Sequence, residues 1–279
     1  MTSTDSAKPA FYFFEGSAWS TAPRLAIEEL GYDLKKDLDL HSLPLGEGAN
    51  FDPSYLKLAK EGTVPALVDL QGEVLDSTFK VVKYLVANSP KRITLEPSSP
   101  NVIEAVHSDQ IDPNDALLGY AVDDESRKAK GSDLPGQFWN GRQQALEKYA
   151  KSSPPEFKNF YEEKIKYNSY FVKIYSGEAS DEELKEYYAK GKKLWSNIGS
   201  FLSGDLVKFL QNDRKGTFFA GNTPGEVDFH VIAWLARIIT SGGGVEGVEK
   251  LTGKPLDKSV KGYYESWTSR ESFKKLEIV

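Results

Sequence analysis

The chain has 279 residues, a net charge of −6, 39% hydrophobic residues, 12% aromatic residues and no cysteine. This length predicts two domains, and the apolar content is sufficient for buried cores. The negative charge gives no electrostatic reason to expect binding to nucleic acid or to an anionic membrane. The lack of cysteine excludes disulfides, thiolate metal sites and a cysteine nucleophile.

The N-terminal segment MTSTDSAKPA is polar and has no apolar region typical of a signal peptide. The longest apolar region, Val231–Ile239, is interrupted by Arg237 and is too short to span a bilayer. We therefore expect a cytoplasmic protein without a membrane-spanning segment.

The first part of the chain alternates strand and helix patterns. A strand is predicted at 10–14, and a helix at 24–30 that ends at Gly31. A second strand is predicted within 32–40, and a short helix at 53–60. The predicted order up to residue 85 is β-α-β-α-β-β-α.

The loop after the first strand contains Ser17, Ser20 and Pro23. Because proline is tolerated only in the first turn of a helix, Pro23 predicts a helix start near Ser20 or Thr21. Ser17 would then lie a little upstream of the helix. Both serines are also compatible with ordinary loop or cap roles.

The segment 62–85, GTVPALVDLQGEVLDSTFKVVKYL, predicts a strand, a tight turn, a second strand and a helix. Val64 and Pro65 precede the first strand. A proline is unusual at this position because it has no N–H to donate to the hydrogen-bond ladder of a sheet, so it indicates a specific role. Asp76 and Ser77 precede the helix, whose free N–H groups and positive dipole end attract a carboxylate. Alone, Ser77 would be read as a plain helix cap.

The remainder is predicted to be helical. A linker with three prolines spans 88–100, and the segment 109–153 is polar and is expected to be rich in loops. Aromatic residues between 157 and 202 recur at helical spacing and are expected to be mostly core. Asp228 would form half of a capping box, with Gly225 at the cap. The glycines at 242–247 fit G-x-G-x-x-G but follow a helix, which argues against a dinucleotide site.

The three histidines, His41, His107 and His230, lie far apart in the sequence without metal-ligand spacing. We expect surface or packing roles for them, and no metal.

The ordered pairs Val64-Pro65 and Asp76-Ser77 resemble the thioredoxin-like domain of the glutathione transferase superfamily. The segment 218–228 and the C-terminal 264–273 resemble the second domain of that family. The resemblance implies an α/β thioredoxin-like N-terminal domain at 1–90 and an all-α C-terminal domain at 101–279. It is closest to cytosolic, serine-type, fungal members, including groups related to the β-etherases and the FuA-type group.

The resemblance also implies glutathione as co-substrate. A cis bond before Pro65 would turn the backbone of Val64 toward the cysteinyl part, while Asp76 and Ser77 would bind the γ-glutamyl part. Ser17 matches the catalytic position and would stabilise the thiolate, with Ser20 or a backbone amide as alternatives. The implied glutathione contacts are Thr63, Val64, Pro65, Asp76, Ser77 and Asn50.

Two regions of the implied site depart from the family pattern. Thr63 and Gly48 stand where the family often has residues that bind the glycine end, and Asn50 and His41 are weak substitutes. The pocket for the second substrate is expected at Trp19, Tyr120, Phe138 and Trp139.

The function implied is attack of the glutathione thiol on hydrophobic small-molecule electrophiles, including aryl-ether cleavage, by a homodimer. The alternatives are a non-catalytic binding protein for hydrophobic aromatic ligands and a regulatory scaffold with the same fold.

Overall fold

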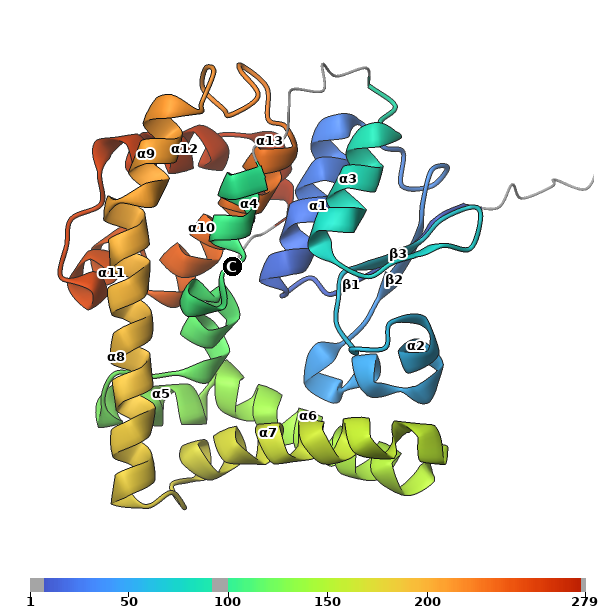
Figure 1. Cartoon of the computed structure of the whole chain (residues 1–279), viewed down its shortest axis with the longest axis vertical. Helices are drawn as coiled ribbons and strands as arrows, with labels where there is room; N and C mark the ends of the chain where they lie inside the picture. Colours follow the sequence, from blue (N-terminus) through green and yellow to red (C-terminus); the bar gives the residue numbers. More distant parts are fainter. Residues whose placement is uncertain (1–7, 92–99, 277–279) are drawn as a thin grey trace, which may run out of the picture.

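The computed structural model describes residues 8–91 and 100–276, in which a small mixed sheet with helices is followed by a largely helical remainder (Figure 1). Most of the predicted linker at 88–100 lies outside the described residues. None of the helices in the described part has the length and apolar character needed to cross a membrane.

The sheet has four strands in the order β2-β1-β3-β4. The central strand β1 (Ala10–Phe13) pairs parallel with β2 (Asp39–Ser42) and antiparallel with β3 (Ala66–Val68). Strand β4 (Val74–Leu75) adds antiparallel to β3. Of the predicted second strand within 32–40, only the end at 39–40 is extended, and β2 continues to Ser42.

Three α-helices accompany the sheet: α1 (Ala18–Leu30), α2 (Pro53–Leu58) and α3 (Thr78–Ala87). Two short 3-10 turns, η1 (Leu45–Glu47) and η2 (Ala49–Phe51), precede α2. The predicted order of strands and helices is therefore confirmed.

Helix α1 begins at Ala18, so the predicted start near Ser20 or Thr21 is wrong. Ser17 is the N-cap residue, with extended backbone angles, and is not upstream of the helix. Gly31 ends the helix in the left-handed conformation, as predicted.

Pro23 lies inside α1 because its missing hydrogen bond is replaced from another helix. A proline cannot donate to the carbonyl four residues earlier, which here belongs to Trp19. The hydroxyl of Thr78, the first residue of α3, donates to that carbonyl at 3.5 Å. The same contact ties α1 to α3.

The part of the chain after residue 100 consists mainly of helices, several of them long. They are α4 (Pro100–Val106), η3 (Asp109–Ile111), the π-helical η4 (Asp115–Gly119), α5 (Asp124–Ser132), α6 (Leu134–Ser152), η5 (Pro155–Phe157), α7 (Lys158–Ser176), α8 (Asp181–Ser203), α9 (Asp205–Asn212), α10 (Glu226–Ser241), α11 (Val245–Thr252), α12 (Lys258–Thr268) and α13 (Glu271–Lys275).

The expectation of a loop-rich segment at 109–153 is wrong, because η3, η4, α5 and α6 occupy most of it. Asp123 starts α5 through a capping box with Ser126. Pro135 stands at the start of α6, where proline is favoured. Gly136 serves packing instead of a turn, since a Cβ there would lie 2.0 Å from the carbonyl oxygen of Gly131.

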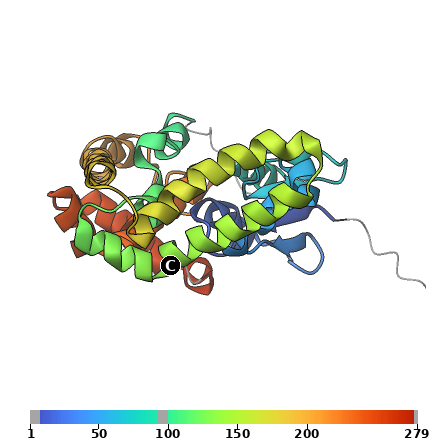
Figure 2. The ribbon, with the colours of Figure 1, turned by 90° about the horizontal axis from the view of Figure 1, so that it is seen from below.

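Helices α6 and α7 lie side by side and cross the lower edge of the molecule beneath α2 (Figures 1 and 2). Helix α6 packs closely on the η1–η2 segment. A Cβ at Gly141 would meet the carbonyl oxygen of Gly46 at 2.2 Å, and one at Gly48 would meet the Cβ of Ala145 at 2.4 Å. The backbones therefore touch at Gly141, and at Gly48 the methyl group of Ala145 occupies the space that a Cβ would need.

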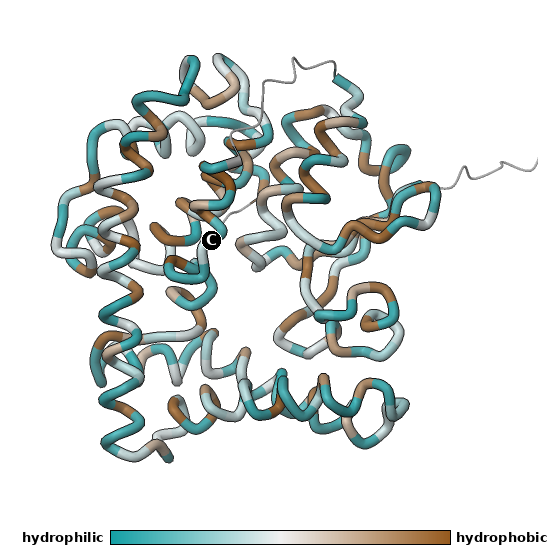
Figure 3. Tube along the Cα trace, in the orientation of Figure 1, coloured by the Kyte–Doolittle hydropathy of each residue, from teal (hydrophilic) through white to brown (hydrophobic). Residues whose placement is uncertain are grey.

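Helix α10 is buried from Val227 to Ile239, consistent with its apolar sequence on all sides. It packs against α1, and the same core cluster includes Phe11 of the sheet, Leu25 of α1 and Trp234 of α10. Figure 3 shows apolar residues along the strands and the adjacent helices. One core thus joins the sheet to the helical part.

Asp228 fixes the first turn of α10, as the half capping box predicted. Its carboxylate accepts hydrogen bonds from the backbone N–H groups of Phe219, Gly225 and Ala220 at 2.9, 2.9 and 3.3 Å. The hydroxyl of Tyr263 adds a fourth at 3.0 Å. Burial raises the pKa of Asp228 to about 6, while these hydrogen bonds oppose the shift.

Replacing Asp228 should destabilise the fold. Asp228→Ala leaves three backbone donors without an acceptor and should lower the free energy of unfolding by about 3 kcal/mol or more. Tyr263→Phe removes a single hydrogen bond and should cost only about 1 kcal/mol. Denaturant unfolding measures both, and equal losses would contradict this role for the carboxylate.

Candidate functional site

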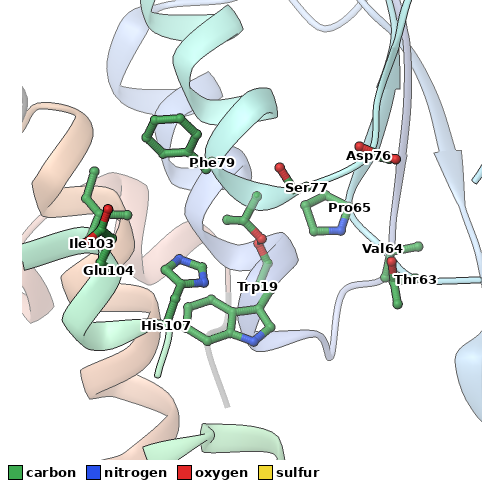
Figure 4. Close-up of a pocket in the computed structure, with 11 residues that line it drawn as sticks. Trp19, Thr63, Val64, Pro65, Asp76, Ser77, Phe79, Ile103, Glu104 and His107 are labelled. Atoms are coloured by element: carbon green, nitrogen blue, oxygen red, sulfur yellow. The ribbon is translucent and has the colours of Figure 1, made fainter. Parts of the chain in front are cut away.

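Two neighbouring cavities lie between the sheet half and the helical half of the chain. One has a volume of about 470 Å³ and is shown in Figure 4, and the other has a volume of about 360 Å³. Trp19, Thr63 and Val64 line both of them. The two cavities therefore adjoin at these three residues, and an elongated ligand that passes Val64 would reach both of them.

The Val64–Pro65 peptide bond is cis, as the sequence resemblance implied. Val64 lines both cavities, and no hydrogen bond among the described residues uses its backbone N–H or carbonyl. The preceding carbonyl, of Thr63, accepts a hydrogen bond from Tyr55 at 2.6 Å. Val64 thus offers one donor and one acceptor to a bound peptide.

Asp76 and Ser77 lie together in the wall of the larger cavity, next to Pro65 (Figure 4). Ser77 caps α3 and accepts a hydrogen bond from the N–H of Lys80 at 3.3 Å. The carboxylate of Asp76 pairs with the ammonium of Lys80 at 2.7 Å. This hydrogen bond holds the pKa of Asp76 below its usual value, so the carboxylate is charged at neutral pH.

Ser17 and Ser20 are in different surroundings, although the sequence left both as candidates. Ser17 lines the smaller cavity, and its Oγ accepts from the N–H of Ser20 at 3.2 Å. Ser20 is 0% exposed, and its Oγ accepts from the N–H of Phe14 at 3.3 Å. Only Ser17 therefore presents its hydroxyl to the cavity.

The first turn of α1 also has free donors beside Ser17. Among the described residues, the N–H groups of Ala18 and Trp19 make no hydrogen bond, and the hydroxyl of Ser17 donates none. A helix N-terminus of this kind attracts negative charge. The junction is thus suited to an anion such as a thiolate.

A histidine pair borders the larger cavity, which the sequence did not predict. The ring of His107 stacks on Trp19 with centroids 3.9 Å apart (Figure 4), and its Nε2 lies 2.8 Å from Nδ1 of His230. Burial lowers the pKa of His107 to about 4 and that of His230 well below 6.5. Both rings are neutral, one nitrogen donating to the other.

The two histidines were expected to be separate surface or packing residues. They are 123 positions apart, so no local sequence pattern could reveal the contact. The third, His41, stacks on Tyr12 and lies 2.9 Å from the carboxylate of Asp39.

The aromatic residues expected around the second substrate are only partly brought together. Trp19, Phe138 and Trp139 line the smaller cavity. Tyr120 does not, because its ring packs against Phe171 and it borders a different surface depression. The expectation that Tyr120 belongs to this wall is corrected accordingly.

Polar residues close the far end of the smaller cavity. Asn50 is 2% exposed and donates to the carbonyl of Gly62, while its Oδ1 has no partner. Burial raises the pKa of Asp115 to about 6, with the charge of Asp112 adding to the shift. Arg142 reaches the same cavity from α6. These residues were outside the predicted site except for Asn50.

Metal binding finds no support in the described residues, which contain no group of three or more His, Asp or Glu side chains that could hold an ion.

Comparisons with known proteins bear on the fold of the chain. A family model for the N-terminal domain of glutathione S-transferases matches residues 11–93. The solved structure of Gtt2 from Saccharomyces cerevisiae is similar at a TM-score of 0.50 and 17% identity, over 96% of this chain and 99% of that one. No curated protein sequence matches.

Two further similar structures contain glutathione. A glutathione transferase homologue from Lodderomyces elongisporus, with two GSH per subunit, has a TM-score of 0.49 and 15% identity over 97% of both chains. One from Sulfitobacter, with bound glutathione, has a TM-score of 0.46 and 15% identity, also over 97% of both chains. The predicted fold, thioredoxin-like followed by a largely helical part, is confirmed.

The histidine pair should make stability depend on pH. Because the pKa of His107 falls from 6.5 to about 4 on folding, the unfolded chain takes up the proton first as the pH drops. This part of the stability is present above pH 6.5 and is lost toward pH 4. At about pH 5 the loss should be about 1–2 kcal/mol.

Unfolding of wild type and His107→Gln at about pH 7.5 and about pH 5 measures this contribution as a difference. The variant should lose less stability on acidification. The comparison between variant and wild type is needed because Asp115 acts in the opposite direction. Burial raises its pKa to about 6, so its protonation on acidification stabilises the folded state. Parallel curves for wild type and His107→Gln would contradict the assignment.

Proposed function

Because the chain belongs to the glutathione transferase superfamily through its N-terminal domain, we propose that it is a glutathione transferase. It ionises the thiol of glutathione and directs the sulfur at hydrophobic electrophiles. The observation that carries this proposal is the junction at the start of α1. There Ser17, the N-cap of α1, and Trp19, whose N–H makes no hydrogen bond among the described residues, line the same cavity as Val64.

Glutathione fits the cleft as an extended peptide. Its cysteinyl part pairs with the N–H and carbonyl of Val64, since one residue can exchange both bonds with a facing residue in an antiparallel pair. The γ-glutamyl ammonium meets Asp76, and its carboxylate lies at the start of α3 beside Ser77. The thiol then points toward Ser17.

The interactions available to the thiol are of the required size. A free thiol titrates near pH ~8.5, so full ionisation at neutral pH requires a shift of about two units, or about 2.7 kcal/mol. A hydroxyl hydrogen bond to the thiolate contributes about 1.5–3 kcal/mol. The helix N-terminus adds about 0.3–1 kcal/mol. Ser17 acts as a hydrogen-bond donor and forms no covalent bond.

The electrophile lies against Trp19, Phe138 and Trp139 in the smaller cavity. These aromatic walls favour a hydrophobic, planar acceptor. The thiolate forms a carbon–sulfur bond while the leaving group departs with the bonding electrons, and for an aryl ether the leaving aryloxide then takes a proton. Aryl-ether cleavage is thus within the proposed chemistry.

The proposal has further parts, which follow from the family resemblance. The protein is a cytoplasmic, serine-type enzyme of the fungal kind that detoxifies electrophiles, and it forms a twofold homodimer. Its domains span 1–90 and 101–279.

A non-catalytic binding protein for aromatic ligands is the second candidate. It is favoured by the pairing of Asp76 with Lys80, which partly offsets the charge meant for the ligand ammonium.

Ser17→Ala should raise the pKa of bound glutathione by about one to two units. Ultraviolet absorbance of the thiolate, titrated against pH, measures this. Conjugation to an activated chloronitrobenzene at neutral pH should slow about ten- to a hundredfold.

Ser20→Ala is the matched control. Since Ser20 bonds the N–H of Phe14 inside the protein, its loss should lower stability and leave the pKa of bound glutathione unchanged. If neither variant changes that pKa while glutathione still binds, backbone amides stabilise the thiolate. A wild-type thiol that does not ionise would support the binding protein.

Asp76→Ala should weaken glutathione binding about ten- to a hundredfold, because a charge-assisted hydrogen bond of about 1.5–3 kcal/mol is lost. Lys80→Met is the opposite change, and it should keep or improve affinity by releasing the carboxylate. Calorimetry that finds equal affinity in Asp76→Ala and wild type would remove Asp76 from the site.

A further inference from the structure

Helix α6 brings an unpaired guanidinium into the cleft. Arg142 lines the smaller cavity, and among the described residues it makes no hydrogen bond and no ion pair. Its Nε is buried without an acceptor. Burial lowers its pKa to about 10, which leaves it charged at neutral pH. The side chain is half-buried, and a cation partly removed from water with no acceptor is costly, so this group calls for a partner.

The packing around Arg142 holds the guanidinium without satisfying it. Its central carbon lies 4.3 Å from the ring centre of Phe51, 4.8 Å from that of Phe138 and 5.9 Å from that of Trp139. Such cation–π contacts act on the faces of the guanidinium plane and leave its two terminal Nη groups free to donate, whereas Nε is buried. The fork is therefore fixed in place and available to a planar anion.

The direction of the proposed peptide indicates which anion arrives there. The proposed function puts the γ-glutamyl end at Asp76 and Ser77, which lie beside Pro65 in the wall of the larger cavity (Figure 4). The other end of the tripeptide must then extend past Val64 in the opposite direction. That direction leads into the smaller cavity, which Asn50 and Arg142 line.

No other cation is available for that end. Among the described residues that line the two cavities, Arg142 is the only lysine or arginine. The η1–η2 segment that faces α6 contains no basic residue from Leu43 to Leu56. Asp115 lines the same cavity, and its charge interacts with that of Lys130; among the described residues, neither Asp115 nor Asp112 forms an ion pair with Arg142.

We infer that Arg142, from the helical half of the chain, binds the glycine carboxylate of glutathione through its guanidinium, with the side chain of Asn50 beside it. This assignment rests on the proposed function. It gives the segment 109–153 a part in binding the co-substrate, and it supplies the glycine-end contact that Thr63 and Gly48 do not provide.

Calorimetry on the full chain with two ligands tests the inference. Glutathione carries the glycine carboxylate, and γ-glutamylcysteine lacks the glycine. Wild type should bind glutathione about ten- to a hundredfold more tightly, as expected for a charge-assisted hydrogen bond. Arg142→Gln should lose this preference by weakening glutathione alone, with γ-glutamylcysteine unchanged.

Two controls separate charge from folding. Lys148→Gln removes the same charge from an exposed position of α6, outside both cavities, and should bind both ligands like the wild type. Glutathione esterified at its glycine carboxylate should bind the unaltered protein as weakly as γ-glutamylcysteine does. The ester experiment needs no variant and therefore stands even if Arg142→Gln fails to fold.

Other outcomes overturn the inference in distinguishable ways. If wild type binds neither ligand, the proposed function fails together with it. If Arg142→Gln keeps the preference for glutathione, the glycine end is bound elsewhere and the proposed function stands. If Arg142→Gln loses only the binding of an aromatic electrophile that carries a carboxylate, the guanidinium binds the second substrate and not glutathione.

Discussion

The loop that carries Ser17 is held by a cation from the other half of the chain. Arg237, within α10, donates a hydrogen bond to the carbonyl of Gly16 at 2.7 Å. Its side chain is buried, and burial lowers its pKa to about 10. A buried guanidinium without hydrogen-bond acceptors would raise the free energy of the folded state. The bond to Gly16 therefore stabilises the contact between the loop and α10. The candidate thiolate site therefore exists only when both halves are docked.

Helix α10 can act as that anchor because it is itself fixed at its first turn. The carboxylate of Asp228 accepts hydrogen bonds from backbone N–H groups of the preceding loop, and the apolar residues that follow are buried on every side of the helix. His230, one turn from the start, then meets His107, whose ring supports Trp19. A single buried helix thus positions the loop at Ser17 and, through His107, the ring of Trp19.

Local patterns in the sequence predicted the sheet half well. The Val64-Pro65 strand, the Ser77 cap and the end of α1 at Gly31 each depend on residues within a few positions of one another. The start of α1 was predicted wrongly. The hydrogen bond that Pro23 cannot make is replaced by one from the hydroxyl of Thr78, which lies 55 positions further along the chain. Such a compensation cannot be read from the neighbours of the proline.

The helical half was harder to predict for the same reason. Gly131 and Gly136 suggested loops, yet they allow two helices to touch, and that use depends on a partner backbone. The pairing of His107 with His230 likewise joins residues with no shared local pattern. The same is true of Asn50 and Arg142, which line one cavity. Residue types alone could indicate aromatic walls, but not that Tyr120 would face away from the cleft.

The size of the smaller cavity is set by backbone contacts more than by side chains. Helix α6, which carries Phe138, Trp139 and Arg142, rests on the η1–η2 segment through Gly141 and Gly48. A shift of α6 toward the sheet is blocked by these contacts, and a shift away would expose the buried face of Trp139. A cavity of about 360 Å³ with fixed walls therefore selects acceptors by shape. Since the loop at Ser17 is held separately by α10, the aromatic side chains Phe138 and Trp139 on α6 can change the electrophile without moving the residues around the thiol.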